Sequence, residues 1–182
     1  MNISKSFRDQ VIAAIPSLRA FGLSLTARGD QADDLVQETL MKAWKHCDSF
    51  EPGSNMKAWL YTILRNEFYT QLRKRKREVE DADGFYSSKV AVRAEQEGHL
   101  DMADLRDALA KLPEDQREAV ILVGASGFSY EEAAEICKVA VGTIKSRVNR
   151  GRAKLVELLD IGMDEKFGPD SSTEAVLNNP FR

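Results

Sequence analysis

Apolar residues recur at steps of three and four positions through most of the chain, and this spacing restricts the fold more than any other feature. Residues 5–25 show it with Phe7, Val11, Ile15, Leu18 and Leu25. Such a period places the apolar side chains on one face of an α-helix. No segment has the two-residue alternation of a half-buried strand. The sequence therefore predicts an all-α fold.

Breaks in this period divide the first part of the chain into three expected helices. Gly29 ends the first, and a second follows over residues 30–46 with Asp30 as its expected N-cap. After a turn at residues 50–55, a third helix is expected over residues 56–78. We expect the second helix to bury Val36, Leu40 and Trp44, and the third carries Trp59, Ile63 and Leu72 among its apolar positions.

The composition changes in the middle of the chain. Residues 79–103 are acidic and show only weak helical periodicity. We interpret them as a linker with partial structure, which joins two small helical domains expected over residues 1–78 and 104–162. The tail at residues 163–182 is expected to be flexible in part.

The segment after this linker is predicted to contain a helix-turn-helix. A short helix carries Leu105, Leu109 and Leu112, and the next begins at Pro113, turns Val120 and Val123 inward and ends at residues 124–128. Ser129 and Glu132 then fit the S-x-x-E capping box that begins a further helix. After a tight turn at residues 138–142, the final helix is expected to bury Ile144, Val148 and Leu155. A short capped helix, a turn and a longer helix form the helix-turn-helix layout.

Positive charge is concentrated in two stretches of a chain whose formal net charge is −3. Residues 65–77 carry a net charge of +5 and residues 138–154 a net charge of +6, so the remainder carries −14. Nucleic-acid binding must therefore come from these local patches and not from the overall charge.

The basic patch of the final helix suits the major groove of DNA. Its residues outside the predicted core are Thr143, Lys145, Ser146, Arg147, Asn149, Arg150 and Arg152. In a major groove, Lys and Arg reach guanine acceptors and Asn pairs with adenine, while other side chains hold phosphates. The alternative is a solvated basic face on an ordinary helix.

The third helix mixes aromatic and basic residues, which is typical of a surface for single-stranded DNA. It carries Trp59, Tyr61, Phe68 and Tyr69, followed by a basic run at residues 73–77. Rings can stack on bases while cations follow the phosphates. The alternatives are that Trp59 is a core residue, that Tyr61 and Phe68 are equally suited to core or surface, and that the basic run is a solvated helix end.

Three segments resemble the extracytoplasmic-function (group IV) sigma factors of bacterial RNA polymerase. GFSYEEAAEICKVAVGTIKSRVNRGRAKL resembles their promoter −35 binding domain, ADDLVQETLMKAW their polymerase-binding helix, and SNMKAWLYTILRNEFYTQLRKRKR the element that opens and reads the −10 region. The segments follow the family's order and cover about half of the chain. Within the family, the chain is most similar to the EcfG-type general-stress sigma factors of alphaproteobacteria.

The resemblance implies three sets of functional residues. The set for docking on the β′ clamp coiled coil of the polymerase is Asp34, Gln37, Glu38 and Met41. The set for the −10 element is Asn55, Tyr61, Asn66, Tyr69, Arg73, Lys74 and Arg77, with the loop at residues 52–57 holding an extruded base. The set for the −35 element is Thr143, Lys145, Ser146, Arg147, Asn149 and Arg150. The implied partners are the polymerase core, promoter DNA and an anti-sigma factor.

Two other classes of protein share parts of this pattern. A conventional helix-turn-helix regulator would bind duplex DNA but would not need the exposed Gln37–Glu38 pair or the aromatic and basic third helix. A sigma-factor mimic that sequesters an anti-sigma protein would not need intact DNA-reading helices. The chain has both basic patches, which favours a genuine sigma factor.

Several functions are not expected from this sequence. It has no nucleophile–base pair or phosphate-binding loop, so we expect no enzyme activity and no cofactor. His46, Cys47, His99 and Cys137 lack the spacing of a metal site. No stretch is long enough to span a membrane, no signal peptide is recognised at the N-terminus, and the two isolated cysteines suit a reducing cytoplasm.

Overall fold

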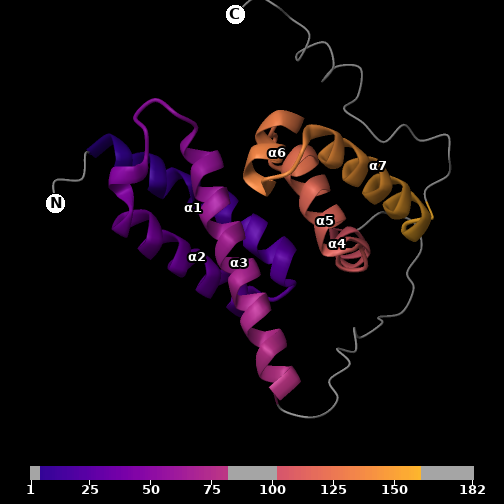
Figure 1. Ribbon diagram of the computed structural model, residues 1–182. Helices are drawn as coiled ribbons and strands as arrows, with labels where there is room; N and C mark the ends of the chain where they lie inside the picture. Colours follow the sequence, from indigo (N-terminus) through magenta and orange to yellow (C-terminus); the bar gives the residue numbers. More distant parts are fainter. Residues whose placement is uncertain (1–4, 82–101, 161–182) are drawn as a thin grey trace, which may run out of the picture.

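The computed structural model describes residues 5–81 and 102–160, and every element in these ranges is helical (Figure 1). The first half contains α1 (Lys5–Thr26), α2 (Gly29–Lys45), the 3-10 turn η1 (Cys47–Ser49) and α3 (Met56–Asp81). The second half contains α4 (Met102–Ala110), α5 (Glu114–Val120), the π-helical turn η2 (Ile121–Ala125), α6 (Tyr130–Cys137) and α7 (Val141–Leu158). The predicted all-α class is confirmed. Most of the predicted linker and the whole predicted tail lie outside the described residues.

In the first half, α1, α2 and α3 enclose one core. At one end of it, the Phe7 ring contacts Trp44, Phe50 and Trp59 edge-on, with ring centroids 5.7, 5.7 and 6.0 Å away. The expected buried positions of α2 need correction. Ala32, Leu35, Val36, Thr39 and Ala43 are buried, whereas Leu40 and Trp44 lie half-buried at the border. Gly22 of α1 lies against Ala32 of α2, and a Cβ on Gly22 would lie 3.5 Å from the Ala32 carbonyl oxygen. The small size of these two residues lets the helices approach closely at this point.

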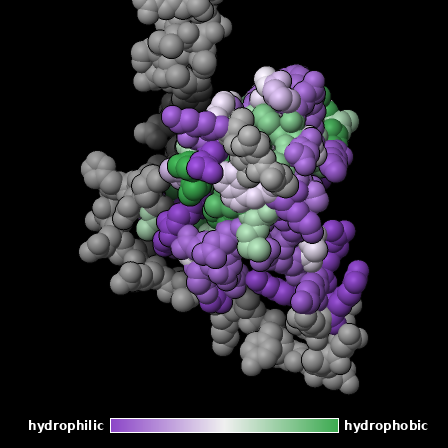
Figure 2. Space-filling view, turned by 90° about the vertical axis from the view of Figure 1, so that its left-hand side faces the viewer, coloured by the Kyte–Doolittle hydropathy of each residue, from purple (hydrophilic) through white to green (hydrophobic). Residues whose placement is uncertain are grey.

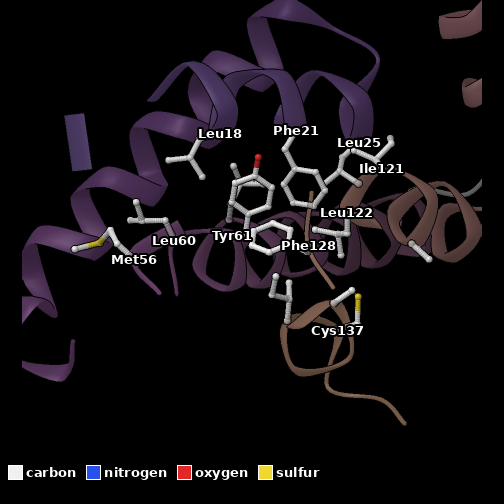
Figure 3. Packing of buried hydrophobic residues seen from close by; sticks show 14 of the residues in the cluster. Leu18, Phe21, Leu25, Met56, Leu60, Tyr61, Ile121, Leu122, Phe128 and Cys137 are labelled. Atoms are coloured by element: carbon white, nitrogen blue, oxygen red, sulfur yellow. The ribbon is translucent and has the colours of Figure 1, made fainter. Parts of the chain in front are cut away.

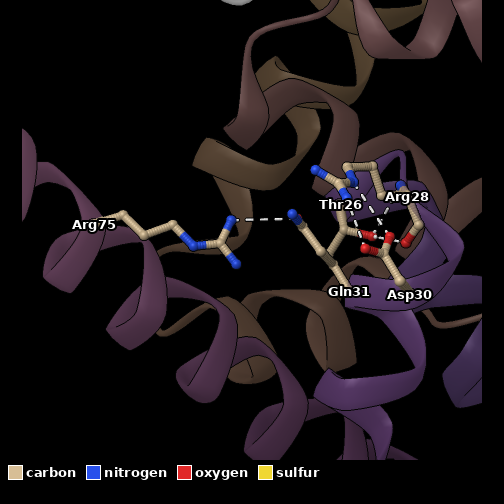
Figure 4. Close-up of polar contacts among 5 residues, drawn as sticks. All are labelled: Thr26, Arg28, Asp30, Gln31 and Arg75. Atoms are coloured by element: carbon tan, nitrogen blue, oxygen red, sulfur yellow. Dashed lines mark hydrogen bonds and ion pairs between the residues drawn. The ribbon is translucent and has the colours of Figure 1, made fainter. Parts of the chain in front are cut away.

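The predicted N-cap of α2 was also wrong by two positions. The helix begins at Gly29, Arg28 occupies the N-cap without a side-chain cap bond, and Asp30 lies in the first turn. The Asp30 carboxylate pairs with Arg28, with 2.7 Å between Oδ2 and Nη2 (Figure 4). Asp30 still lies close to the positive end of the helix dipole, where a carboxylate is stabilising.

The helix-turn-helix of the second half is formed by α6 and α7. The capping box is confirmed, since Ser129 Oγ accepts from the Glu132 amide at 3.1 Å and Glu132 Oε2 accepts from the Ser129 amide at 2.9 Å. Lys138 ends α6 in the left-handed conformation, with φ of 56°. Ile144, Val148 and Leu155 are buried, as predicted.

The inward face of α5 and of the π-turn that follows it differs from the prediction. Val120 and Val123 are only half-buried, while Ala119, Ile121 and Leu122 are buried. The Ser126 amide bonds to the Ile121 carbonyl five residues earlier, at 2.8 Å. A π-turn inserts extra residues per turn, so the side chains after Val120 rotate away from the faces that a regular α-helix would give them.

The two halves share a continuous hydrophobic core. α3 packs against α6, and α1 packs against α4 and α5. Figure 3 shows side chains of both halves in one cluster, with Leu18, Phe21, Leu25, Leu60 and Tyr61 from the first and Ile121, Leu122, Phe128 and Cys137 from the second. The Tyr61 and Phe128 rings meet edge-on with centroids 4.9 Å apart. The two domains are therefore packed against each other in this structure.

Candidate polymerase and promoter interfaces

The outer face of α2 carries the predicted docking residues as one exposed strip. Asp34, Gln37, Glu38, Met41 and Lys45 are all exposed, and 64 % of the Met41 surface is accessible. Their spacing of three and four residues places them on one side of the helix. The side of the molecule in Figure 2 is mostly hydrophilic, with a few hydrophobic side chains among the polar ones. An exposed methionine beside acidic and amide groups is suited to contact with another protein.

Two ion pairs hold this helix against its neighbours. Arg19 of α1 contacts Asp33, with 2.6 Å between Nε and Oδ1. Lys42 pairs with Glu67 of α3, whose other oxygen accepts from Gln71 Nε2 at 2.9 Å. Burial would raise the pKa of Glu67, but the bonds from Lys42 and Gln71 outweigh it and bring that pKa below its ordinary value. The exposed strip thus lies on a helix that is connected to both α1 and α3 by ion pairs.

Part of the predicted −10 set lies along the exposed side of α3. Asn66, Arg73, Lys74 and Arg77 are exposed. Arg73 Nε donates to the Tyr69 carbonyl at 3.2 Å. Close by, Arg75 Nη1 donates to Gln31 Oε1 at 3.2 Å and connects the basic end of α3 to the start of α2 (Figure 4). These side chains together give the C-terminal end of α3 a positively charged surface.

Tyr61 needs correction as a predicted DNA contact. Only 1 % of its surface is accessible, its ring stacks on Phe21 at 4.7 Å, and its hydroxyl donates to the Ser17 carbonyl at 3.1 Å. Because the ring is enclosed by Phe21 and Phe128, it has no free face for a base. An aromatic residue in an amphipathic helix can face either the core or the solvent, and the sequence alone did not distinguish these two positions for Tyr61.

Two other members of the −10 set contact the second half of the molecule. Asn55 Oδ1 accepts from the Ala58 amide at 3.1 Å at the start of α3, while its Nδ2 donates to Glu132 at 2.8 Å. The Tyr69 hydroxyl donates to Glu118 at 3.3 Å. These two residues are therefore occupied by carboxylates in this arrangement.

The predicted −35 set lies on α7, and most of it is exposed. Lys145, Ser146, Asn149 and Arg150 are exposed, and Thr143 is half-buried. Arg150 is aligned along the helix, since its Nη2 donates to Ser146 Oγ at 3.2 Å. Lys145 Nζ lies 5.8 Å from the centre of the Tyr130 ring.

Arg147 differs from the other members of this set because it pairs with a carboxylate of the protein. Its side chain is only 19 % exposed, and its Nε lies 3.0 Å from Asp115 Oδ2 of α5. This pair connects α5 to α7 and orients the helix-turn-helix. The sequence suggested a base or phosphate contact because it could not show that Asp115 lies beside this position.

Comparisons with known proteins place this arrangement in a family. The family models that match are Sigma-70 region 2, over residues 11–78, and Sigma-70 region 4, over residues 102–155. The chain is 59 % identical over 177 residues to the ECF RNA polymerase sigma factor EcfG of Rhodopseudomonas palustris strain TIE-1, covering 97 % of this chain and 98 % of the relative. The chain belongs to the ECF sigma factor family. The resemblance to the EcfG type is confirmed.

Solved structures agree with the assignment of this chain to the sigma factor family. The complex of the sigma factor RpoE with the anti-sigma factor NepR from Bartonella quintana matches at 59 % identity with a TM-score of 0.78, covering 87 % of this chain and 99 % of that one. The complex of CnrH with the cytosolic domain of CnrY matches at 27 % identity with a TM-score of 0.64, covering 86 % and 88 %.

Sequence reasoning missed a polar cluster between the two halves of the sigma factor. Glu118 of α5 is fully buried, and its Oε1 lies 2.7 Å from Nε of Arg65 on α3. Burial raises the pKa of Glu118, and burial together with Glu118 raises that of Cys137 to about 12. The only signal in the sequence is an acidic residue directly before the apolar run AVILV at residues 119–123.

Two further observations bear on function. Among residues 5–81 and 102–160, no group of three or more His, Cys, Asp or Glu side chains is placed to hold a metal ion. In the same ranges, no helix has both the length and the apolar character needed to cross a bilayer.

Proposed function

We propose that this alternative sigma factor directs the RNA polymerase core to general-stress promoters with three separate surfaces. The α2 strip docks on the polymerase, α7 reads the −35 duplex, and the exposed side of α3 binds the −10 element. The observation that supports this best is that all three predicted surfaces lie on helices of one fold that matches both sigma regions. The polymerase performs the chemistry, so the sigma factor needs no catalytic residue or cofactor of its own.

The docking surface is the α2 strip of Asp34, Gln37, Glu38 and Met41, and its partner is the β′ clamp coiled coil. Exposure of all four residues supports this role. Met41 supplies an adaptable apolar contact, and the acidic and amide groups around it supply charge complementarity and hydrogen bonds.

The −35 surface is the exposed side of α7. Lys145 and Arg150 reach guanine acceptors in the major groove, and Asn149 can pair with adenine. Ser146 and Thr143 contact the phosphate backbone. Arg147 supports this surface from behind through its pair with Asp115.

The −10 surface is the exposed side of α3, where Arg73, Lys74 and Arg77 attract the backbone and Asn66 contacts a base. Asn55 and Tyr69 join this surface once they leave their present carboxylate partners. A freed Tyr69 ring could then stack on an unpaired base, which is worth roughly 1–3 kcal/mol.

An anti-sigma factor is the proposed regulator. The similar sigma factor RpoE was solved with the anti-sigma factor NepR, and CnrH with the cytosolic domain of CnrY. We expect a comparable partner for this chain. Because the sigma factor works on the bacterial polymerase, we also expect the sigma factor to act in the cytoplasm.

Transcription reconstituted from purified components tests the proposal. Polymerase core with this protein should initiate at a promoter with −35 and −10 elements, while either component alone should not. A protein that footprints duplex DNA tightly by itself and gains nothing from core would be a conventional regulator. A protein that binds an anti-sigma factor but supports no transcription would be a sigma mimic.

A further inference from the structure

The contact between the two halves joins groups that the proposed function needs for DNA. We propose that the free sigma factor is autoinhibited: carboxylates of the second half bind −10 residues of the first half and hold the molecule closed. The inference rests on the proposed −10 role of Asn55 and Tyr69. We call the carboxylates of Glu118 and Glu132 the latch. The two halves also meet through the apolar contact of Tyr61 with Phe128.

Glu118 is the buried part of this latch. It belongs to the second half, yet its carboxylate contacts two residues of α3. It forms an ion pair with Arg65, with 2.7 Å between Oε1 and Nε, and it accepts a hydrogen bond from the Tyr69 hydroxyl at 3.3 Å. The Arg65 guanidinium also lies over the Tyr69 ring, 4.7 Å from its centre. A carboxylate in this position neutralises the charge of Arg65 and takes up the Tyr69 hydroxyl, which belongs to the proposed −10 surface.

Glu132 is the outer part of the latch. Its Oε2 completes the capping box of α6 by accepting from the Ser129 amide, and its Oε1 accepts from Asn55 Nδ2. Asn55 cannot simply turn its amide around, because its Oδ1 accepts from the Ala58 amide. Lys57 adds another polar contact between the halves by donating from Nζ to the Ser126 carbonyl at 2.6 Å.

The energetics of such contacts suit a reversible latch. A buried ion pair gives little net stability, because the loss of solvation offsets most of the attraction. Removing one partner is costly, however, because a buried charge remains unpaired. The ion pair thus makes the closed state specific and adds little to the stability that the shared apolar core provides. A polymerase that binds only the open state can shift the population.

Neutralising the latch carboxylates one at a time tests the inference on the full-length protein. Glu132→Gln keeps one oxygen for the Ser129 amide but turns an NH2 group toward Asn55, so the cap survives and the contact between halves does not. Glu118→Gln leaves Arg65 without its counter-charge. The matched control is Glu131→Gln, which makes the same charge change at an exposed neighbouring position of α6.

The readouts are small-angle scattering of the free protein and its affinity for a single-stranded −10 oligonucleotide. We expect Glu132→Gln to raise that affinity several-fold and Glu118→Gln by roughly tenfold or more, each with a larger radius of gyration. The control should match the unmodified protein in both. If Glu118→Gln does not fold, as judged by circular dichroism, the results for Glu132→Gln alone test the inference.

Two results would overturn the inference: latch variants as compact as the control, or expanded variants with no gain in oligonucleotide affinity. Core-dependent transcription by the unmodified protein is measured alongside. Loss of that activity would instead contradict the proposed function, so the two failures can be told apart.

Discussion

Among single residues, Glu38 allows the most direct test of the docking surface, because it is exposed on α2. Glu38→Lys should leave the fold intact and reverse a charge at the centre of the strip. We expect affinity for the polymerase core to fall by about tenfold, or ~1.4 kcal/mol. Fluorescence titration with labelled protein measures this. Asp9→Lys on α1 is the matched control, and equal affinities for the two variants would remove Glu38 from the interface.

Lys145 and Arg150 test whether α7 reads bases or holds phosphates. Each alanine variant should weaken use of the −35 element while −10 opening remains. A lost base contact should cost about 1–3 kcal/mol and relax the sequence preference at one position, whereas a lost phosphate contact should weaken all sequences alike. Transcription from a library of −35 variants distinguishes the two roles. Unchanged output from every promoter would show that neither residue contacts DNA.

Glu67 gives the first half a defined response to acid. Its folded-state pKa is lowered, so the bonds to Lys42 and Gln71 stabilise the fold above the unfolded pKa of about 4.3 and are lost as pH falls through the folded value. Glu67→Gln should therefore cost about 1 kcal/mol at pH 7 and much less near pH 3. Urea unfolding at the two pH values measures the difference. A cost that stays the same at pH 3 would contradict this account.

At the level of single residues, the sequence predicted some features of the site and missed others. Exposure of Glu38 and Arg150 followed from helical spacing alone. The burial of Tyr61 and the Arg147–Asp115 pair did not, because each depends on a neighbour from a distant part of the chain. Glu118 was missed for the same reason, since a buried acid is recognisable only once Arg65 is seen beside it.

At the level of elements, Gly151 sets how closely α7 approaches α5. A Cβ at this position would lie 2.6 Å from Val120 Cγ2 and 3.4 Å from the Gln116 carbonyl oxygen. Gly151→Val should therefore destabilise the second half by about 1–3 kcal/mol through overpacking. Gly142→Val is the matched control, since it makes the same change at an exposed position of α7 where a Cβ would meet nothing within 4 Å. Equal urea midpoints for the two variants would show that the contact is not tight.

Elements with local signals were predicted well, and those shaped by packing were not. The capping box at Ser129 and the inward face of α7 are written in short sequence patterns, and both are confirmed. The π-turn η2 has no such pattern, so the predicted inward residues of α5 were displaced. The start of α2 was misplaced because Asp30 is as favourable in the first turn as at the cap.

Across the whole molecule, the sequence predicted two domains but not their contact. Helical periodicity identifies the apolar face of each helix, yet it does not say which part of that face meets the same domain and which part meets the other. Phe128 illustrates this, since it follows the π-turn of the second half and packs on Tyr61 of the first. The joint core and the Glu118 cluster therefore emerge only in three dimensions.

The reactivity of the Cys137 thiol can be used to test whether this joint core is formed in solution. It is buried beside Glu118 and Arg65, and burial with the nearby carboxylate raises its pKa to about 12. At pH 8 roughly one thiol in 10⁴ would then be ionised, against about a quarter for an ordinary cysteine. Cys47 is half-buried in the first half and serves as the internal reference. We expect iodoacetamide to modify Cys47 at least about a hundredfold faster, as followed by mass spectrometry of peptides.

Opening of the two halves should remove this protection. Alkylation of a buried thiol proceeds through transiently open molecules, so its rate follows their population. Glu132→Gln should thus speed modification of Cys137 several-fold while Cys47 keeps its rate, and Glu131→Gln should change neither. Glu132→Gln is the informative variant because it leaves Glu118 and Arg65 in place around the thiol. Equal rates for Cys137 and Cys47 in the unmodified protein would mean that the halves are already apart in solution.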